Sequence, residues 1–323
     1  MNKEMAIKHM NQLGAERESF LFIVDFEMRH NLVISPREAF LQGILFNFNG
    51  HSNYPKSIDK PQNIELDKNP IPFTVYDNAY QKVLYHLQRG NSYLVNLTFE
   101  TPVQTEKSLT QIFHGSVAKY RLLYQNQFVV FSPETFIKTN ENLIFTFPMK
   151  GTIDATVPDA RELLLSNKKE LAEHATIVDL LRNDLSRVAT NVTVDRFRYI
   201  DKIQSNQKSL LQVSSQISGK LPAHFRKNIG NIVFEMLPAG SISGAPKKKT
   251  LEIIAEAENY SRGYYTGIAG YFDGSNLDSC VLIRYIENRN GCFFYKSGGG
   301  ITTQSNEKEE YNELIEKIYV PIG

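Results

Sequence analysis

Two pairs of glutamates could bind a metal ion, because each pair has the spacing of one helix face. Glu170 and Glu173 are three residues apart, and Glu310 and Glu313 repeat this spacing near the C-terminal end. Carboxylate oxygens are the ligands that magnesium prefers, and magnesium keeps positions for water or substrate. Two pairs that face each other would therefore suit Mg²⁺. Solvated helix surfaces show the same spacing and are the commoner case, so the spacing alone leaves both explanations open.

Two glycine-containing segments could bring backbone atoms close to a ligand. Residues 240–246, Gly-Ser-Ile-Ser-Gly-Ala-Pro, lead into a predicted helix, whose free amides can bind an anion. An ordinary flexible loop has the same composition. Gly298, Gly299 and Gly300 lie between a predicted strand and a predicted helix and permit close backbone approach. A sharp turn would need fewer glycines, which favours a functional role.

One lysine could be a nucleophile. Lys150 follows a predicted strand, residues 143–148, and precedes Gly151 and Thr152. A lysine at the end of a strand is usually solvated. In a buried site, the same amine can lose its proton and attack carbon.

Composition excludes several classes of protein. The 323 residues suffice for one large domain or two ordinary ones, and 41% hydrophobic residues support a sizeable core. The 36 Lys and Arg residues balance 35 Asp and Glu residues, and the basic run at 247–249 is typical of a solvated helix face. We therefore expect no nucleic-acid binding.

Cysteine usage and the apolar pattern predict a soluble cytoplasmic protein. The two cysteines, Cys280 and Cys292, form neither a disulfide framework nor a zinc motif, and we expect both to be core thiols in a reducing compartment. The N-terminus lacks the apolar stretch of a signal peptide, and no run is long enough to cross a bilayer. We therefore expect no membrane partner.

Periodicity predicts the elements that position these residues. Alternation and β-branched or aromatic residues predict strands, and apolar residues at helical spacing predict helices. Asn290-Gly291 is a strong two-residue hairpin signal. The predicted strands are 20–27, 32–35, 43–48, 92–99, 120–124, 127–131, 136–139, 143–147, 264–272, 280–287 and 292–296. The predicted helices are about 76–87, 160–185, 222–236, 247–258 and 307–318, with a surface excursion at 51–72.

Most predicted strands are close in sequence to another strand with which they can form a hairpin. This arrangement is typical of an antiparallel α+β fold rather than a doubly wound parallel sheet.

Seven ordered segments resemble the chorismate-utilising enzymes, and specifically the aminodeoxychorismate synthase component I branch. The resemblance covers about residues 75–318. It is carried by Ser132-Pro133-Glu134, PMKGT at 148–152, ELAEHATIVDLLRNDLSRVA at 170–189, PAGSISGAPK at 238–247, RGYYTGIAGY at 262–271, Ile283-Arg284, and GGGI at 298–301 through Glu310-Tyr311-Asn312-Glu313 to Lys317.

The resemblance implies a single chorismate-utilising domain over residues 1–323. Its fold would be two stacked, largely antiparallel sheets decorated by helices, with chorismate in the cleft. Residues 1–72 would be a shortened N-terminal region of strands and loop.

The resemblance also implies roles for individual residues. Glu173 and Glu313, supported by Glu170 and Glu310, would hold Mg²⁺ against the ring carboxylate. Glu134 would be the general acid that protonates the departing ring hydroxyl, and burial would raise its pKa from about 4.3. The implied substrate-binding residues are Arg284 and Tyr265 at the enolpyruvyl carboxylate, with Gly151, Thr152, Ser243, Gly244, Gly298, Gly299, Gly300 and Lys317 around the substrate.

Three positions separate the branches of the family. The resemblance implies that lysine at 150 marks the aminodeoxychorismate branch, where anthranilate and isochorismate synthases have alanine. Enzymes that add water have a lysine at the position of Leu94, and leucine cannot activate water. Most ammonia-using relatives have glutamine there, and many relatives have histidine at the position of Gln212. A glutamine is a poor acid or base, which weakens the anthranilate alternative because that product requires loss of pyruvate.

The sequence therefore predicts a synthase subunit that makes 4-amino-4-deoxychorismate for para-aminobenzoate and folate biosynthesis, through a covalent intermediate on Lys150. Neither cysteine lies in a Gly-x-Cys-x-Gly elbow, so ammonia would come from a separate glutamine amidotransferase subunit or from solution. The alternatives are anthranilate synthase component I and a non-catalytic chorismate-binding protein.

Overall fold

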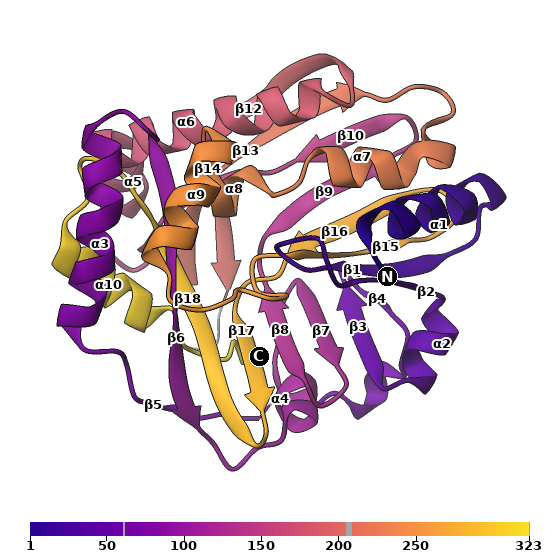
Figure 1. Cartoon of the computed structure of the whole chain (residues 1–323), viewed down its shortest axis with the longest axis horizontal. Coiled ribbons are helices and arrows are strands. Elements are labelled where there is room, and N and C mark those ends of the chain that lie inside the picture. The colour runs from indigo at the N-terminus through magenta and orange to yellow at the C-terminus, as the bar shows by residue number, and fades with distance from the viewer. Residues whose placement is uncertain (61, 205–208, 323) are drawn as a thin grey trace.

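Two nine-stranded sheets with helices around them form the core of the protein (Figure 1). The structure is a computed structural model and describes residues 1–60, 62–204 and 209–322. Every strand pairing between these residues is antiparallel. The α+β class with two antiparallel sheets is therefore confirmed.

The first sheet carries Lys150 in its edge strand. In spatial order, its strands are β11 (Met149–Asp154), β13 (Ser209–Lys220), β10 (Leu143–Thr146), β9 (Thr135–Asn140), β16 (Leu277–Val281), β15 (Ile268–Phe272), β1 (Phe20–Val24) and β2 (Asn31–Ile34). A further strand, β12 (Thr190–Gln204), pairs with β13.

The second sheet carries the three consecutive glycines. In spatial order, its strands are β14 (Gly244–Ala245), β6 (Leu94–Gln104), β18 (Cys292–Ile301), β17 (Tyr285–Arg289), β8 (Phe128–Ser132), β7 (Tyr120–Tyr124), β3 (Ile44–Phe48) and β4 (His51–Ser52). A short strand, β5 (Asp67–Lys68), pairs with β6.

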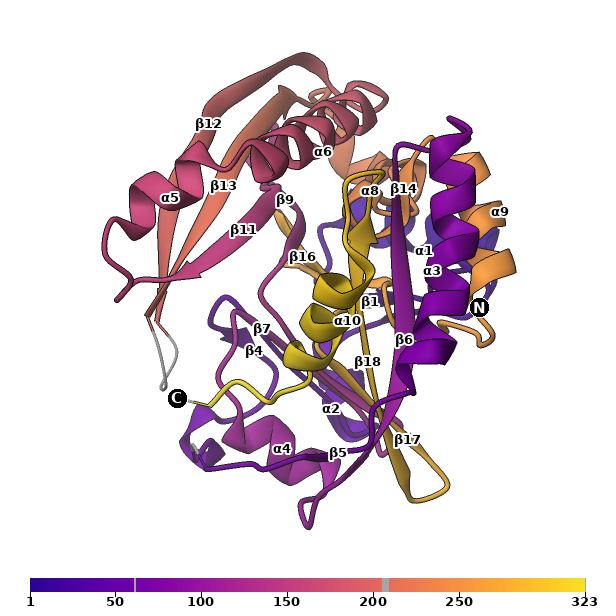
Figure 2. The same cartoon turned by 90° about the vertical axis from the view of Figure 1, so that its left-hand side faces the viewer.

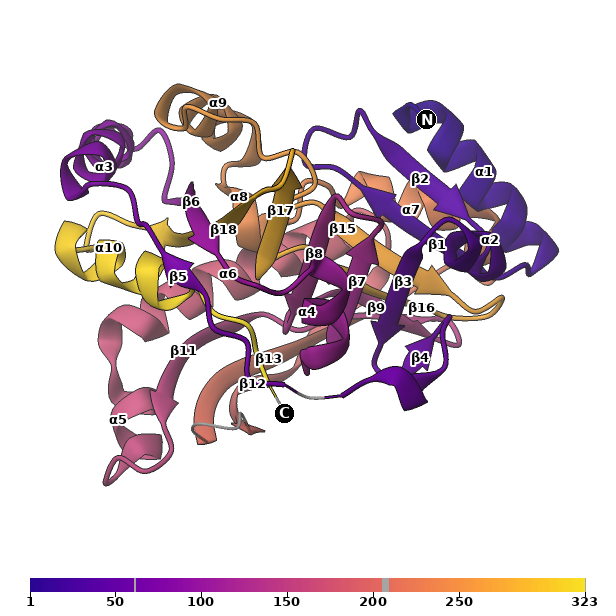
Figure 3. The ribbon, with the colours of Figure 1, turned by 90° about the horizontal axis from the view of Figure 1, so that it is seen from below.

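The helices cover both sheets. Those near the first sheet are α1 (Lys3–Glu16), α5 (Ala160–Ser166), α6 (Lys168–Ser186) and α7 (Ile229–Glu235). Those near the second sheet are α2 (Pro36–Leu41), α3 (Phe73–Gln88), α4 (Leu109–Gly115), α8 (Gly240–Ser243), α9 (Lys247–Ala257) and α10 (Glu307–Glu316). Figure 3 shows α1 and α2 at one end of the molecule and α3, α9 and α10 at the other.

Strand β1 shows why the core lies where it does. All five residues of Phe20–Val24 are buried, although successive side chains point to opposite faces. Phe20 and Phe22 pack in the cluster that includes residues of α1 and α7, whereas Leu21 and Ile23 pack in the cluster that includes residues of β3, β7 and β8. A strand covered on both faces is apolar throughout, which is the pattern in the sequence.

The predicted hairpins 120–124/127–131 and 136–139/143–147 are confirmed, and so is the turn at Asn290-Gly291. Arg289 pairs with Cys292 across that turn, and Asn290 and Gly291 have φ of 54° and 90°. Both left-handed residues are what a tight hairpin with the sheet's twist requires.

Several elements differ from the prediction. Helices α1 and α2 lie in the N-terminal region that was expected to contain strands and loop, and neither they nor the long strands β12 and β13 were predicted. The predicted helix 160–185 is two helices, because Asn167 has an extended ψ of 110° and its side chain caps α6 by accepting from Glu170 N at 3.1 Å. Cys292 is exposed rather than a core thiol, whereas Cys280 is buried as expected.

Two further differences concern candidate site residues. The predicted strand 280–287 is broken between β16 and β17, which belong to different sheets. Arg284 lies in this break with a left-handed φ of 57°. The predicted strand 292–296 is longer in the structure, because Gly298–Gly300 continue β18 and pair with residues 96–98 of β6.

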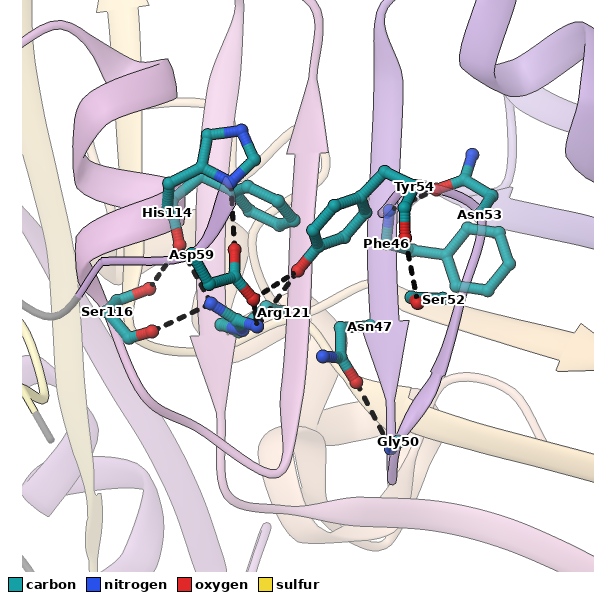
Figure 4. A network of polar contacts seen from close by, with 11 residues as sticks. Phe46, Asn47, Gly50, Ser52, Asn53, Tyr54, Asp59, His114, Ser116 and Arg121 are labelled. Atoms are coloured by element: carbon teal, nitrogen blue, oxygen red, sulfur yellow. Dashed lines mark hydrogen bonds and ion pairs between the residues drawn. The ribbon is translucent and has the colours of Figure 1, made fainter. Parts of the chain in front are cut away.

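A buried arginine, Arg121, holds Tyr54 and Asp59 of the predicted surface excursion (Figure 4). Arg121 Nη2 donates to Tyr54 Oη at 2.9 Å and to Asp59 Oδ2 at 2.6 Å, and His114 Nδ1 lies 2.8 Å from Asp59 Oδ1. Burial by itself raises the pKa of Asp59, but the hydrogen bonds from His114 and Arg121 outweigh it and lower that pKa. A cavity of about 360 Å³ borders this network beside Lys119.

No helix among the described residues is both long and apolar enough to span a membrane.

Candidate functional site

Both acidic pairs lie in the first two turns of capped helices. Asn167 caps α6, and Asn306 caps α10 by accepting from Lys308 N and Glu309 N at 3.0 and 3.1 Å. Carboxylates near a helix N-terminus are stabilised by the helix dipole. Figure 2 shows α10 and β18 on the side of the second sheet that faces β11 and α6. Glu170 and Glu173 of α6 and Glu313 of α10 all act on the charge of Lys150, so carboxylates of both helices lie near this lysine.

The side chain of Lys150 extends from β11 of the first sheet to β18 of the second sheet. Its Nζ is 3.3 Å from Glu173 Oε2 on α6. A Cβ added to Gly300 would lie 3.1 Å from the same Nζ, so the amine also reaches strand β18 of the second sheet. Gly151 follows with φ of 73° at a register shift in β11, and a Cβ there would lie 3.1 Å from Glu170 Oε2. The lysine thus meets the carboxylates on one side and the glycine strand on the other.

The surroundings of Lys150 hold it protonated in this arrangement. Burial lowers its pKa, but the charges of Glu173, Glu313 and Glu170 outweigh burial and raise it. Desolvation alone therefore does not supply a neutral amine. Transfer of the proton to a neighbouring base is the other route, and Glu173 is within reach.

Glu134 lies in the turn between β8 and β9 and faces the same region. Its backbone N donates to Ser132 Oγ at 3.1 Å, and its carboxyl accepts from Ser241 Oγ at 2.5 Å. Burial raises the pKa of Glu134, and this outweighs the opposing effects of Ser241, Lys150, Arg284 and Lys317. The predicted direction of the shift is confirmed. A carboxyl with a raised pKa retains a proton at higher pH, as a general acid must.

The charge of Arg284 acts on the hydroxyl of Tyr265, so the two residues that were expected to bind a carboxylate lie near each other. Arg284 Nε is buried and has no hydrogen-bond partner among the described residues. A buried guanidinium with a spare donor fits a planar carboxylate. Tyr265 is buried, and burial raises its pKa although Arg262 and Arg284 oppose this. Its hydroxyl therefore remains a neutral hydrogen-bond donor.

The three glycines of β18 form a surface without side chains. A Cβ on Gly298 would lie 2.5 Å from Leu97 O, and one on Gly299 would lie 3.3 Å from Glu310 Oε2. Lys317 Nζ donates to Gly298 O at 2.8 Å and pairs with Glu313 Oε1 at 2.6 Å. Side chains from β11 and α10 therefore converge on bare backbone.

For three of the predicted substrate-binding residues, the structure shows contacts within the protein. Ser243 is buried, but its hydroxyl donates to Ala239 O at 2.9 Å within α8. Gly244 has φ of 118°, and a Cβ there would lie 1.9 Å from Leu94 O, so close strand packing requires this glycine. Thr152 is exposed and pairs with Gln212 of β13.

The carboxylates fit magnesium by chemistry, but they do not form a preassembled centre. No group of three or more His, Cys, Asp and Glu side chains in the described part of the chain has the arrangement of a metal site. Two of the four glutamates instead pair with lysines, Glu173 with Lys150 and Glu313 with Lys317. Oxygen donors from two helices remain a suitable set for a hard cation that also takes ligands from substrate and water.

Sequence reasoning missed Ser241 and the buried ion pair between Asp184 and Lys247, whose atoms are 2.8 Å apart. Both lie in the quoted segments, yet spacing does not reveal which residues face Glu134 or each other. It also missed that Leu94 and Lys150 approach the same point beside Gly300.

Comparison with known sequences gives a consistent result. The family described as chorismate binding enzyme matches residues 13–323. An uncharacterized PabA-like protein of Haemophilus influenzae is 50% identical over 98% of this chain and 96% of its own length. Aminodeoxychorismate synthase component 1 of Bacillus subtilis is 31% identical over 77% of this chain and 55% of its own length. Anthranilate synthase component 1 of Saccharomyces cerevisiae is 36% identical over 59% of this chain and 39% of its own length.

Comparison with solved structures shows the same fold at low identity. The menaquinone-specific isochorismate synthase MenF of Escherichia coli has a TM-score of 0.75 with 16% identity, covering 98% of this chain and 81% of that one. The putative isochorismate synthase DhbC of Bacillus anthracis has a TM-score of 0.73 with 17% identity, covering 98% and 87%. At this identity, the similarity concerns the fold alone.

Proposed function

The chain belongs to the chorismate-binding enzyme family, and from this premise we propose that it converts chorismate and ammonia to 4-amino-4-deoxychorismate. The observation that carries the proposal is the position of Lys150. Its amine lies beside the glycine strand, 3.3 Å from Glu173, and within electrostatic range of Glu134. A nucleophile and a candidate acid thus serve one site, and the resemblance implies lysine at this position for the aminodeoxychorismate branch.

In this proposal, a carboxylate of the substrate binds beside the positively charged Arg284. Arg284 offers its buried, unpartnered Nε to the enolpyruvyl carboxylate, and Tyr265 donates from its neutral hydroxyl. Lys317, tied to Gly298 O, fixes the end of α10 against the glycine strand. These contacts orient the ring, with the glycines leaving room for it.

The reaction then proceeds in two displacements. Glu173 accepts the proton of Lys150, and the neutral amine attacks ring carbon C2. Both ring double bonds shift, from C1=C2 and C5=C6 to C1=C6 and C4=C5, as the C4–O bond breaks, and Glu134 gives its proton to the departing hydroxyl, which leaves as water. Ammonia next adds at C4, both double bonds shift back, and the C2–N bond breaks. The surplus proton of ammonia is released to Glu134, and Glu173 returns its proton to Lys150. Chorismate and ammonia are thereby converted to aminodeoxychorismate and water.

Magnesium belongs to this proposal through Glu170, Glu173, Glu310 and Glu313. When bound, it would supply positive charge that holds the ring carboxylate. The carboxylates of α6 and α10 are the residues that would hold it.

Leu94 supports amination over hydration. A Cβ on Gly300 would lie 3.0 Å from Leu94 Cδ1 and 3.1 Å from Lys150 Nζ, so an apolar side chain borders the amine. Leucine cannot activate a water molecule for attack. The Leu94 side chain therefore disfavours isochorismate as the product.

The rival with a specific observation in its favour is anthranilate synthesis, given the similarity to the yeast anthranilate synthase component. Anthranilate requires loss of pyruvate, for which an acid or base is needed near the ring. Gln212, at the position where many relatives have histidine, pairs with Thr152 beside Lys150 and cannot titrate. This weakens the anthranilate alternative.

The decisive experiment is product identification. The purified chain is incubated with chorismate, Mg²⁺ and ammonium, with and without a downstream lyase that releases para-aminobenzoate. We expect aminodeoxychorismate from ammonium and no product from glutamine, because the proposed glutaminase is a separate subunit. Anthranilate as the product, or binding of chorismate without turnover, would replace the proposal by one of its two rivals.

A further inference from the structure

A hydroxyl outside the predicted site residues contacts the carboxyl of Glu134. Ser241 Oγ donates to Glu134 Oε1 at 2.5 Å, although the two residues are 107 positions apart. Ser241 lies in the short helix α8 within the PAGSISGAPK segment. The contact joins this segment to the turn between β8 and β9.

The α8 segment is held on both sides, so the hydroxyl has a defined position. Lys247, the last residue of the PAGSISGAPK segment, pairs with Asp184 of α6 at 2.8 Å and donates to the backbone oxygen of Met236, just before the segment, at 2.9 Å. A Cβ on Gly240 would lie 2.8 Å from Leu180 Cδ2, so α8 packs directly on α6. The buried Arg262 donates to Ile242 O at 3.1 Å.

The backbone of Glu134 is held as well. Its N donates to Ser132 Oγ at 3.1 Å, and its O accepts from Val281 N at 3.2 Å. With the main chain fixed on both sides of the peptide, the orientation of the carboxyl depends on its side-chain contacts. Ser241 supplies one such contact from a second fixed element.

We infer that Ser241 is a positioning residue for Glu134, whose hydroxyl orients the carboxyl and leaves Oε2 as the oxygen that carries the transferable proton. An oxygen that accepts the serine hydrogen is the carbonyl-type oxygen of the protonated acid. The proton therefore resides on the other oxygen. The inference rests on the proposed function, because it assigns Ser241 to the acid of that reaction.

The same contact adjusts the acidity of Glu134. Donation to the carboxylate stabilises its charged form and opposes burial, so loss of the hydroxyl raises the pKa of Glu134 further. The other groups that act on this carboxyl are Lys150 from β11, Arg284 from the β16–β17 break, Lys317 from the end of α10 and the Cys280 thiol of β16. All four remain in place when only Ser241 is changed.

The test compares Ser241→Ala with Ser241→Thr, which keeps a hydroxyl, and with Ser186→Ala as a control at an exposed serine of α6. The rate of chorismate consumption is measured against pH. In Ser241→Ala we expect kcat to fall about 10-fold or more with KM changed less than about 3-fold. The alkaline limb should move up by about one pH unit, since a hydrogen bond to an ionised group is worth roughly that much. Ser241→Thr should follow the unmodified protein.

Two results would overturn the inference: a Ser241→Ala profile that overlays that of the unmodified protein, or a Ser241→Thr profile equal to that of Ser241→Ala. The second would assign the serine to packing. A titration of the unliganded protein by ¹³C NMR of glutamate carboxyls, with Glu134→Gln to assign the signal, gives a readout that needs no turnover. A Glu134 midpoint unchanged by Ser241→Ala would refute the contact, whereas failure of the unmodified protein to consume chorismate would refute only the proposed function.

Discussion

Lys150 Nζ lies 3.3 Å from Glu173 Oε2, and the two side chains are 24% and 10% exposed. This partly buried ion pair joins the candidate nucleophile of β11 to a candidate metal ligand of α6. The glutamate that raises the pKa of the lysine is also the acceptor within reach of its proton. The charge state of the amine is therefore determined by the carboxylates around it rather than by burial.

The first prediction concerns a covalent intermediate on Lys150. If the amine attacks C2, protein quenched with chorismate and Mg²⁺ but without ammonia should carry a chorismate skeleton that has lost water. Peptide mass spectrometry should place this adduct on Lys150. Lys150→Ala should lose the adduct and most aminodeoxychorismate formation, yet still bind chorismate, because Arg284 and Tyr265 lie elsewhere.

Lys138 provides a matched control for this prediction. It is a partly exposed lysine paired with Asp278 at 2.9 Å, outside the site. Lys138→Ala should keep both the adduct and the product. Full activity with an unchanged product in Lys150→Ala would exclude the covalent role and reopen the choice between the branches of the family.

The second prediction concerns Mg²⁺. Glu173→Gln and Glu313→Gln should each lower turnover by at least about 100-fold, because removal of one carboxylate leaves the cation and substrate charges poorly balanced. Both variants should keep the fold, since neither residue belongs to the hydrophobic clusters. Circular dichroism and turnover at a series of Mg²⁺ concentrations measure the two effects.

Glu309→Gln is the matched control for the metal, because Glu309 is exposed on α10 next to Glu310. It should retain normal turnover and normal dependence on Mg²⁺. Near-normal activity that chelators do not affect, in Glu173→Gln or Glu313→Gln, would show that these side chains do not hold Mg²⁺ during the reaction.

The sequence predicted the fold class from patterns that are local in the chain, whereas the residues that gather around Lys150 were implied by the family resemblance. Helical spacing placed Glu170 and Glu173 on one face, and the turn at Asn290-Gly291 followed from the left-handed preference of those residues. The structure differs from the prediction where tertiary packing overrides the local sequence pattern. The apolar run after Cys280 resembles one strand, but Arg284 divides it between two sheets.

Two properties of the site could not be derived from spacing. The raised pKa of Lys150 depends on carboxylates of α6 and α10, whose approach is a tertiary contact. The bond from Ser241 to Glu134 depends on how α8 packs against α6. Gly298–Gly300 pair with β6 as part of a strand, and a Cβ on Gly298 would meet the backbone of that strand, which glycine spacing alone could not predict.

The third prediction concerns the pH dependence of stability. His174 is buried, its Nε2 lies 2.7 Å from Ser215 Oγ, and burial followed by the charges of Arg198 and Lys150 lowers its pKa from 6.5 to about 4. The unfolded chain therefore binds a proton there at higher pH than the folded chain does. The neutral histidine therefore contributes at most about 3 kcal/mol to the free energy of unfolding above pH 6.5. This contribution is lost as the pH falls toward 4.

Urea denaturation at several pH values measures this effect. His174→Gln cannot titrate, so the difference in unfolding free energy between it and the unmodified protein should change by that amount between pH 7 and pH 4. A difference that is independent of pH would show that His174 is not buried in its neutral form.

The last prediction separates the three glycines of β18 by what a methyl group would meet. In Gly298→Ala, the Cβ would lie 2.5 Å from Leu97 O, a backbone atom of the paired strand, so we expect a loss of about 2 kcal/mol or more in unfolding free energy. In Gly300→Ala, the Cβ would meet Leu94 Cδ1 at 3.0 Å and Lys150 Nζ at 3.1 Å, which are side-chain ends that can move. This variant should lose less than about 1 kcal/mol of stability, yet its kcat/KM should fall at least about 10-fold, because the amine is displaced from its position beside the glycine strand. Urea denaturation and steady-state kinetics measure both quantities, and full activity in a stable Gly300→Ala would show that the reaction does not depend on where the Lys150 amine lies.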